Sequence, residues 1–311
     1  MRVLAAYVAV VLIWSTTPLA IKWSGQGPGY LFGLTARMSI GLACVLPVML
    51  LLRQSLPRDR RAWRVYFAGA GQIYGCMLVT YWSAQFIPSG WISVVFGLTP
   101  LITALLAAIW LRENSLSPGR LLAYGLGIAG LAVMFGSALD FGPEAVPGVA
   151  GILLASLIQS AVSVWLKRLN AHVPAFAQVA GSLLIAVPAL IATWAIGDGV
   201  WPEAIPEQSL YATIYLGVIA TTFGFTLYFY VLKHLPATRV ALITLLTPVF
   251  SLLLGHLANA EPLTPEVLQG TALILGALLL HEATGRRRPV AVAARKRPLR
   301  TAGRSSRGSA P

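Results

Sequence analysis

One arginine stands alone inside a long apolar run, which is an unusual place for a fixed positive charge. Arg37 lies in the stretch LTARMSIGLA, and the nearest preceding turn signal is Pro28. If a helix begins near Pro28, a rise of 1.5 Å per residue places Arg37 about 14 Å along it. A charge so far inside an apolar span is costly and is a functional hypothesis by default. We expect the guanidinium either to bind a carboxylate or phosphate, or to stabilise backbone carbonyls of a helical bundle.

A second set of residues could line a pocket beside this arginine. Tyr74, Leu78 and Tyr81 recur at i, i+4 and i+7 and therefore share one helix face. Such stripes commonly form helix–helix contacts, but hydroxyls inside an apolar bundle favour a cavity wall. Aromatic rings and hydroxyls together suit an amphipathic solute such as an amino acid. With Arg37, the candidate pocket residues are Trp14, Thr17, Tyr74, Tyr81, Trp91, Gln159, Thr222, Thr226 and Thr244.

Five further residues mark the ends or the middle of apolar runs. Glu113 and Glu261 each precede a Ser/Thr-Pro pair that is typical of a helix beginning, so we expect both to be structural caps, with proton coupling as the alternative. Lys22 lies near the end of a run, where it either extends to the membrane interface or attracts anions at a cavity mouth. Pro100 and Pro248 interrupt two runs at matching points, and we expect them to act as hinges.

Composition predicts the elements that carry these residues. Of 311 residues, 57% are hydrophobic and 11% are charged, against about 25% charged in soluble domains. With a mean hydropathy of +0.75, the chain has more apolar surface than a soluble core can cover, which argues against a soluble enzyme. A bilayer core needs about 20 apolar residues per crossing helix. The runs predict ten helices near 3–24, 29–52, 63–86, 88–111, 117–137, 147–167, 173–196, 209–233, 236–258 and 264–282.

The charge distribution predicts how these helices cross the membrane. With the N-terminus inside, all 23 Lys and Arg residues except Lys22 and Arg37 fall on the inner side, and the outer loops contain acidic charges. This is the positive-inside pattern, with both termini cytoplasmic. The net charge of +13 therefore reflects topology rather than binding to nucleic acid. The basic tail 284–311 is predicted to be disordered, and anionic lipids are its candidate partner.

An internal repeat is visible, because residues 81–113 align with 229–261 without a gap. The alignment pairs Pro88 with Pro236, Leu98-Thr99-Pro100 with Leu246-Thr247-Pro248, and Glu113 with Glu261. Five helices per half is an odd number, so the second half enters the membrane inverted. Inverted repeats are typical of secondary transporters. We predict an all-α polytopic membrane protein of ten transmembrane helices in two inverted five-helix repeats, at 1–138 and 145–283, followed by the tail.

Several of these segments also resemble a known family. They are WSTTPLAIKW, the Arg37 segment, and the long blocks that begin with PSGWISVVFGLTP and PATRVALITLLTP. All are similar to the EamA repeat of the drug/metabolite transporter superfamily, over nearly all of residues 3–282. The resemblance implies ten helices and export of amino acids, related metabolites or drugs across a bacterial inner membrane. Gln159 stands where the first repeat has Trp14, so the halves cannot contribute equivalent groups.

Other functions fit the sequence less well. No Asp or Glu lies in the middle of a predicted span and the 4 His residues are scattered, so no catalytic pair or metal cluster is evident. The sequence has no GxxxxGK[ST] motif for ATP-driven pumping. We therefore predict a transporter of a small molecule with no metal, no cofactor and no enzymatic activity. Efflux of drugs or toxic compounds, a non-transporting receptor and a membrane enzyme are the alternatives.

Overall fold

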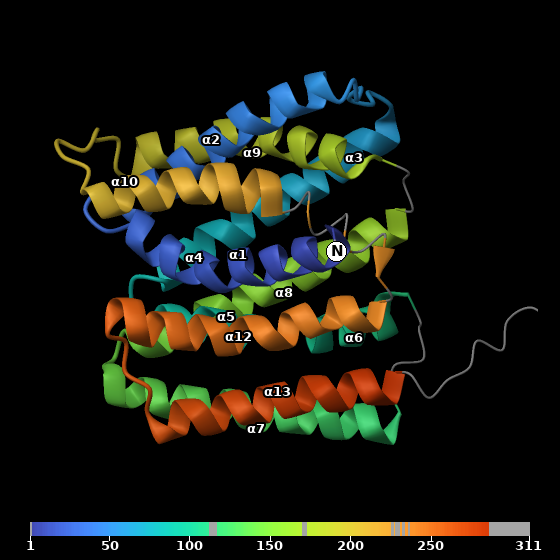
Figure 1. The fold of residues 1–311 in the computed structure, drawn as a ribbon, viewed down its shortest axis with the longest axis vertical. Coiled ribbons are helices and arrows are strands. Elements are labelled where there is room, and N and C mark those ends of the chain that lie inside the picture. The colour runs from blue at the N-terminus through green and yellow to red at the C-terminus, as the bar shows by residue number, and fades with distance from the viewer. Residues whose placement is uncertain are drawn as a thin grey trace, which may run out of the picture.

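The structure is a computed structural model that describes residues 2–111, 117–169, 173–224, 227, 231, 234–235 and 237–285. Within these ranges every regular element is a helix (Figure 1). The elements are α1 (Arg2–Ser24), α2 (Tyr30–Leu51), α3 (Arg60–Gly71), the π-helical η1 (Gln72–Cys76), α4 (Met77–Ser83), α5 (Ser89–Phe96), α6 (Thr99–Trp110), α7 (Pro118–Phe141), α8 (Ala145–Leu169), α9 (Ala175–Gly197), α10 (Glu207–Ile214), the π-helical η2 (Tyr215–Gly224), α12 (Ala237–Asn259) and α13 (Pro265–Gly285).

Seven stretches of the described chain are long and apolar enough to cross a membrane. They are Arg2–Ser24, Tyr30–Leu51, Ser89–Trp110, Pro118–Phe141, Ala145–Leu169, Phe176–Gly197 and Pro265–Thr284. The prediction of an all-α polytopic membrane protein is therefore confirmed. The number of ten crossings stays a prediction, because the expected third and eighth spans are divided between α-helix and π-helix, and α12 has the shorter apolar stretch Ile243–Asn259.

Local sequence signals explain where several helices begin and end. The Asp59 carboxylate accepts the N–H groups of Arg61 and Ala62, which caps the beginning of α3. Gly29, with a φ of 84°, precedes α2, and Gly142, with a φ of 122°, follows α7. Side chains with a Cβ rarely adopt such positive φ values, so glycine permits these sharp turns between antiparallel helices.

The helices form an antiparallel stack with two long helix pairs at its edges. Figure 1 shows α7 beside α13 at one edge and α2 beside α9 at the other, and both pairs are in contact. Between these edges, α1 contacts α12 on one side and α10 and η2 on the other. The interior of the stack is therefore built by helices that are far apart in the chain.

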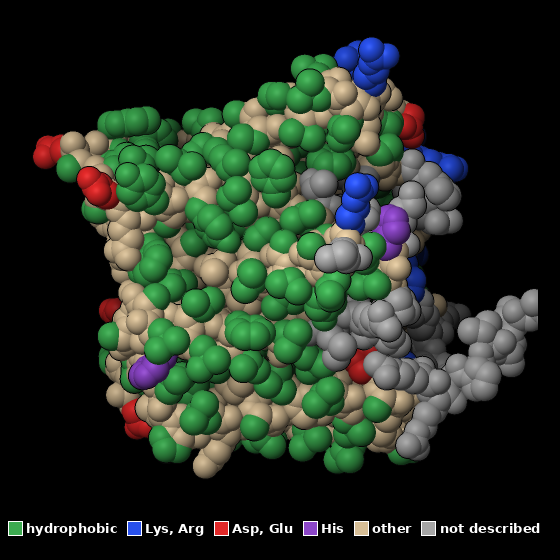
Figure 2. All heavy atoms as spheres, viewed as in Figure 1, with side chains coloured by type: hydrophobic (Ala, Val, Ile, Leu, Met, Phe, Trp, Pro, Cys, Tyr) green, Lys and Arg blue, Asp and Glu red, His purple; other side chains and the backbone are tan. Residues whose placement is uncertain are grey.

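The surface separates apolar and charged side chains in the way a bilayer requires. Figure 2 shows hydrophobic side chains over the length of the face, with the visible Lys and Arg side chains at the right-hand end. Large apolar side chains such as Leu50, Ile128, Ile196 and Leu257 are exposed. Such an extended apolar surface is stable against lipid chains and would be unstable in water.

Two glycines, Gly69 of α3 and Gly217 of η2, let these helices approach their neighbours closely. A Cβ at Gly217 of η2 would lie 2.6 Å from Ile40 Cγ2 and 3.0 Å from the Arg37 carbonyl oxygen, both on α2. At Gly69 of α3, a Cβ would collide with the side chain of Ser182 on α9. In the register of the sequence repeat these two glycines are equivalent, and Gly69 packs against α9 and Gly217 against α2.

This packing predicts that Gly217→Ala destabilises the protein. The added Cβ has no space against α2, and overpacking of this kind costs about 1–3 kcal/mol. Thermal unfolding of the detergent-solubilised protein, followed by tryptophan fluorescence, should show a lower Tm. Gly136→Ala on α7 is the matched control, since nothing lies within 4 Å of a Cβ there. Equal Tm values for the two variants would contradict the close approach of α2 and η2.

Candidate functional site

Arg37 lies in the middle of α2 and only 6% of its surface is exposed. Its Nε and Nη1 atoms are buried and have no hydrogen-bond partner in the part of the chain that the structure describes. The guanidinium carbon lies 6.0 Å from the centre of the Tyr81 ring on α4, which is within range of a cation–π contact. One ring face offsets little of the cost of burying a charge. The guanidinium is thus well suited to bind an anion.

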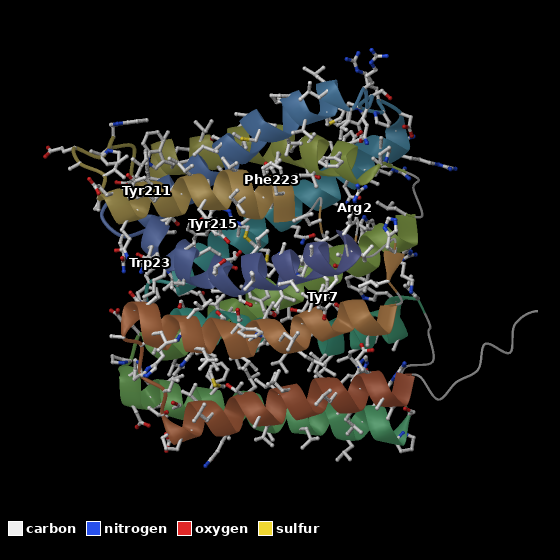
Figure 3. All side chains as sticks on the ribbon, viewed as in Figure 1. Arg2, Tyr7, Trp23, Tyr211, Tyr215 and Phe223 are labelled. Carbon is white, nitrogen blue, oxygen red and sulfur yellow. The ribbon has the colours of Figure 1, made fainter. Side chains whose placement is uncertain are left out.

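A tyrosine that the sequence analysis did not single out lies near Arg37. Tyr215, at the beginning of η2, is half-buried, and its hydroxyl shares a hydrogen bond of 2.5 Å with Thr16 Oγ1 of α1. The charge of Arg37 acts on the Tyr215 hydroxyl, and Figure 3 shows Tyr215 between η2 and α1. The sequence signal for this residue is a tyrosine inside an apolar span, two positions before Gly217.

Two predicted pocket residues form hydrogen bonds between helices. The hydroxyls of Tyr74, on η1, and Thr193, on α9, share a hydrogen bond of 2.7 Å. Gln159 of α8 accepts a weak hydrogen bond of 3.8 Å from the Cys76 thiol, also on η1. Polar side chains of η1 therefore face both α8 and α9. Short π-helical segments occur frequently at functional sites, because their wider turn redirects side chains.

Other predicted pocket residues hydrogen-bond within their own helices. The Thr17 hydroxyl donates to the Ile13 carbonyl at 2.6 Å, and the Thr222 hydroxyl donates to the Gly217 carbonyl at 3.3 Å. A hydroxyl whose proton is used in this way can still accept a hydrogen bond from a ligand. Trp14 is half-buried and packs against two groups of buried apolar residues, one of them between α1 and α12.

The remaining predicted pocket residues lie elsewhere or are not described. Trp91 is fully buried on α5 and packs edge-on against Phe141 of α7, with 5.0 Å between ring centres. Thr244 is half-buried on α12, and Thr226 lies outside the described residues. The described contacts therefore group Arg37 with Tyr81 and Tyr215, whereas the described ring contact of Trp91 is with Phe141.

Lys22 and Glu261 belong to one polar network at an end of the bundle. The Lys22 ammonium donates to the Ile87 carbonyl at 2.7 Å. The Glu261 carboxylate, which is 7% exposed, accepts the Ser89 hydroxyl at 2.9 Å and the Gly90 N–H at 3.3 Å. Glu261 thus lies at the beginning of α5, where a negative charge is favourable, rather than at the beginning of the following helix α13. Sequence position alone did not identify α5 as the helix whose first residues this carboxylate contacts.

Two aromatic residues extend this network to the end of α1. The indole N–H of Trp23 donates to Asn259 Oδ1 at 3.0 Å, and the Asn259 amide donates to Glu261 Oε1 at 2.9 Å. The Ser24 hydroxyl donates to the Tyr81 hydroxyl at 3.3 Å. Figure 3 shows Trp23 near the left-hand end of the stack. The helix ends at this side of the molecule are therefore held together by hydrogen bonds.

The two prolines occupy different structural positions, and one glutamate is not described. Pro100 lies in the first turn of α6, directly after the chain is interrupted between α5 and α6 at Gly97 and Leu98. Pro248 lies inside α12, which continues through it. The equivalent sequence positions thus coincide with a helix break in only one half. Glu113 lies outside the described residues.

These groups can bind a small polar molecule in the apolar interior. A guanidinium, two tyrosine rings and several hydroxyls come from α1, α2, α4 and η2. No group of three or more His, Cys, Asp or Glu side chains that could hold a metal ion occurs among the described residues. A buried charge inside a multi-pass helical bundle is characteristic of a protein that moves solutes across a membrane.

Comparison with known proteins agrees with this class. Residues 1–136 and 146–281 match the EamA-like transporter family, and the chain belongs to this family. It is 28% identical to the aromatic amino acid exporter YddG of Ancylobacter novellus, over 89% of this chain and 96% of that protein. It is 25% identical to a probable terminal-alkyne amino-acid exporter of Streptantibioticus cattleyicolor, over 91% and 98%. A crystal structure with 25% identity superposes with a TM-score of 0.65, covering 92% and 99%.

The protein is therefore a multi-pass membrane transporter of small molecules and not an enzyme. The predicted membership of the EamA family is confirmed. These matches identify the class, whereas the roles of individual residues rest on the contacts described above.

The network around Glu261 predicts that Glu261→Gln lowers stability. The substitution removes a buried negative charge that accepts three hydrogen bonds and lies close enough to Lys22 to interact with it. The expected cost is about 1–3 kcal/mol, seen as a lower Tm in thermal unfolding. Glu266→Gln is the control, since Glu266 is exposed in the first turn of α13. If both variants unfold at the wild-type temperature, the network does not stabilise the bundle.

Proposed function

We propose that the protein exports amino acids or related amphipathic metabolites by alternating access, and that Arg37 binds the carboxylate of the substrate. The observation that carries the proposal is the buried guanidinium, whose Nε and Nη1 atoms have no protein partner in the described chain. A carboxylate can accept two parallel hydrogen bonds from a guanidinium. The Tyr81 ring and the Tyr215–Thr16 pair would then contact the rest of the solute.

Features of the two halves support an inverted repeat at 1–138 and 145–283. The family matches two separate stretches of similar length. The segment Gln72–Cys76 aligns with residues 220–224, and both are π-helical. The equivalent glycines Gly69 and Gly217 pack against α9 and α2, which are the second helices of opposite halves. Two relatives named as amino acid exporters support the substrate class.

The network of Lys22 and Glu261 has a role in this cycle. It joins α1, the beginning of α5 and the end of α12, and so closes one end of the bundle in this conformation. Alternating access requires these bonds to break and re-form. The helix break before Pro100 provides a point at which α5 and α6 can move relative to each other.

The proposed orientation follows from the charges at the two ends. The basic end carries Arg2 and the beginning of α3, and we assign it to the cytoplasm of a bacterial inner membrane, with both termini inside. The basic tail 284–311 would then lie beside anionic lipid headgroups.

Arg37→Gln is expected to lower export strongly while leaving the protein in the membrane. Losing a charge-assisted pair with the substrate costs a factor of about ten or more in transport. Untargeted metabolite profiling of the medium, at equal expression, compares wild type, Arg37→Gln and empty vector. Arg61→Gln is the control, because Arg61 is exposed at the beginning of α3. Wild-type accumulation with Arg37→Gln would make Arg37 structural and overturn its proposed role.

The orientation has its own test. Green fluorescent protein fused after Pro311 should fluoresce, and alkaline phosphatase fused at the same point should be inactive, since neither folds productively on the opposite side. The same reporters inserted after Asp198, in the loop between α9 and α10, should give the reverse result. Identical results at the two positions would contradict the proposed topology.

A further inference from the structure

A cavity separate from the Arg37 site lies between α6, α8 and α13. Its volume is about 380 Å³, within the range of about 300–1,000 Å³ typical of small-molecule sites. Its polar lining comes from Thr99 and Thr103 of α6, Ser163 and Lys167 of α8, and His281 and Glu282 of α13. The apolar part of the wall includes Ala104, Ala107 and Val164. None of these residues contributes to the contacts of Arg37.

Two polar groups in the cavity wall lack protein partners in the described chain. His281 is 9% exposed, and neither of its ring nitrogens has a hydrogen-bond partner there. The Thr99 hydroxyl is also buried without one. On α7, the centre of the Tyr124 ring lies 6.2 Å from the centre of the imidazole, and Arg120 acts on the imidazole electrostatically. Buried polar groups without partners are rare in proteins and indicate a missing ligand or water.

The charges of the cavity point to the chemistry of its ligand. Lys167 and Glu282 line the same cavity with opposite charges, Lys167 exposed and Glu282 half-buried. A ligand with one anionic and one cationic group can interact with both, and its apolar part can lie against Ala104, Ala107 and Val164. Both charged residues lie near the C-terminal ends of their helices, at the end of the stack where α1 begins (Figure 1). The cavity is therefore on the basic side of the protein.

Hydrogen bonds beside this cavity join α6 to α8. Thr103 donates a hydrogen bond of 3.0 Å to the Ser160 hydroxyl, which donates in turn to the Thr99 carbonyl at 3.2 Å. The residue before Ser160 is Gln159, which accepts the bond from Cys76 on η1. The contact between α6 and α8 thus separates the cavity from the π-helical segment η1.

We propose that this cavity is a second binding site, which takes a small zwitterion on the basic side of the protein. The proposal rests on the proposed export of amino acids and adds a second site for the same class of ligand. The ammonium of the ligand faces Glu282, its anionic group faces Lys167, and His281 supplies a further hydrogen bond. A free amino acid and the phosphoethanolamine headgroup of a lipid share this chemistry.

The test is the number of amino acids bound per chain. Purified full-length protein in nanodiscs of phosphatidylcholine and phosphatidylglycerol is dialysed to equilibrium against radiolabelled L-leucine or L-phenylalanine. Wild type should bind two per chain at saturation. Ala104→Phe, which fills the cavity, and Arg37→Gln should each bind one. Leu105→Phe is the matched control, because Leu105 is 41% exposed on the same helix, and it should bind two.

The outcomes separate the two proposals. One bound amino acid in wild type, lost in Arg37→Gln and kept in Ala104→Phe, overturns the second site and leaves the export proposal intact. No binding to wild type overturns both. Lys167→Gln keeps the cavity open and should raise the second Kd about tenfold, so it decides the matter if Ala104→Phe does not fold. If added phosphatidylethanolamine displaces the second amino acid only, the site stands and the headgroup is its occupant.

Discussion

A guanidinium inside an apolar bundle must have an opposite charge or a strong hydrogen-bond acceptor nearby, and this requirement shapes the middle of the molecule. Helical backbone satisfies its own polar groups, so the surrounding helices can offer Arg37 little besides side chains. The Tyr81 ring and the Tyr215 hydroxyl offset part of the cost of burying this charge. The approach of η2 to α2 at Gly217, where any Cβ would collide, brings Tyr215 towards Arg37. The close helix packing and the incomplete pairing of the arginine are two aspects of one arrangement.

The polar groups around Glu261 and around His281 differ in the hydrogen bonds that they form. The Glu261 carboxylate accepts hydrogen bonds from Ser89, Gly90 and Asn259. These bonds join helices from distant parts of the chain. Around His281, the described chain offers an aromatic ring, the charge of Arg120 and a cavity, but no hydrogen-bond partner for either ring nitrogen. Satisfied networks stabilise one arrangement of helices, whereas unsatisfied groups gain free energy only when something binds. A transporter needs both, since it must hold a conformation and also respond to its solute.

The sequence identity of about 25% to relatives of nearly equal length is compatible with a chain in which some positions are tightly constrained and others are not. Lipid-facing positions require only apolar side chains, so many substitutions there leave the fold unchanged. Close contacts such as that of Gly217, and helix beginnings such as that of α5 at Glu261, tolerate few residue types. One fold can host sites for different solutes, and family membership therefore defines the class of the protein more firmly than its cargo.

Much of the fold could be predicted from the sequence, because hydropathy and helix signals act over short distances along the chain. By itself the sequence determined the all-α membrane class, the EamA family and the buried position of Arg37. Only the tertiary structure decided which helices are neighbours. It placed Glu261 at the beginning of α5, Trp91 against Phe141, and Tyr215 beside Thr16. Such contacts join residues that are far apart in the chain. They are selected by side-chain packing between helices, and no local sequence pattern encodes that packing.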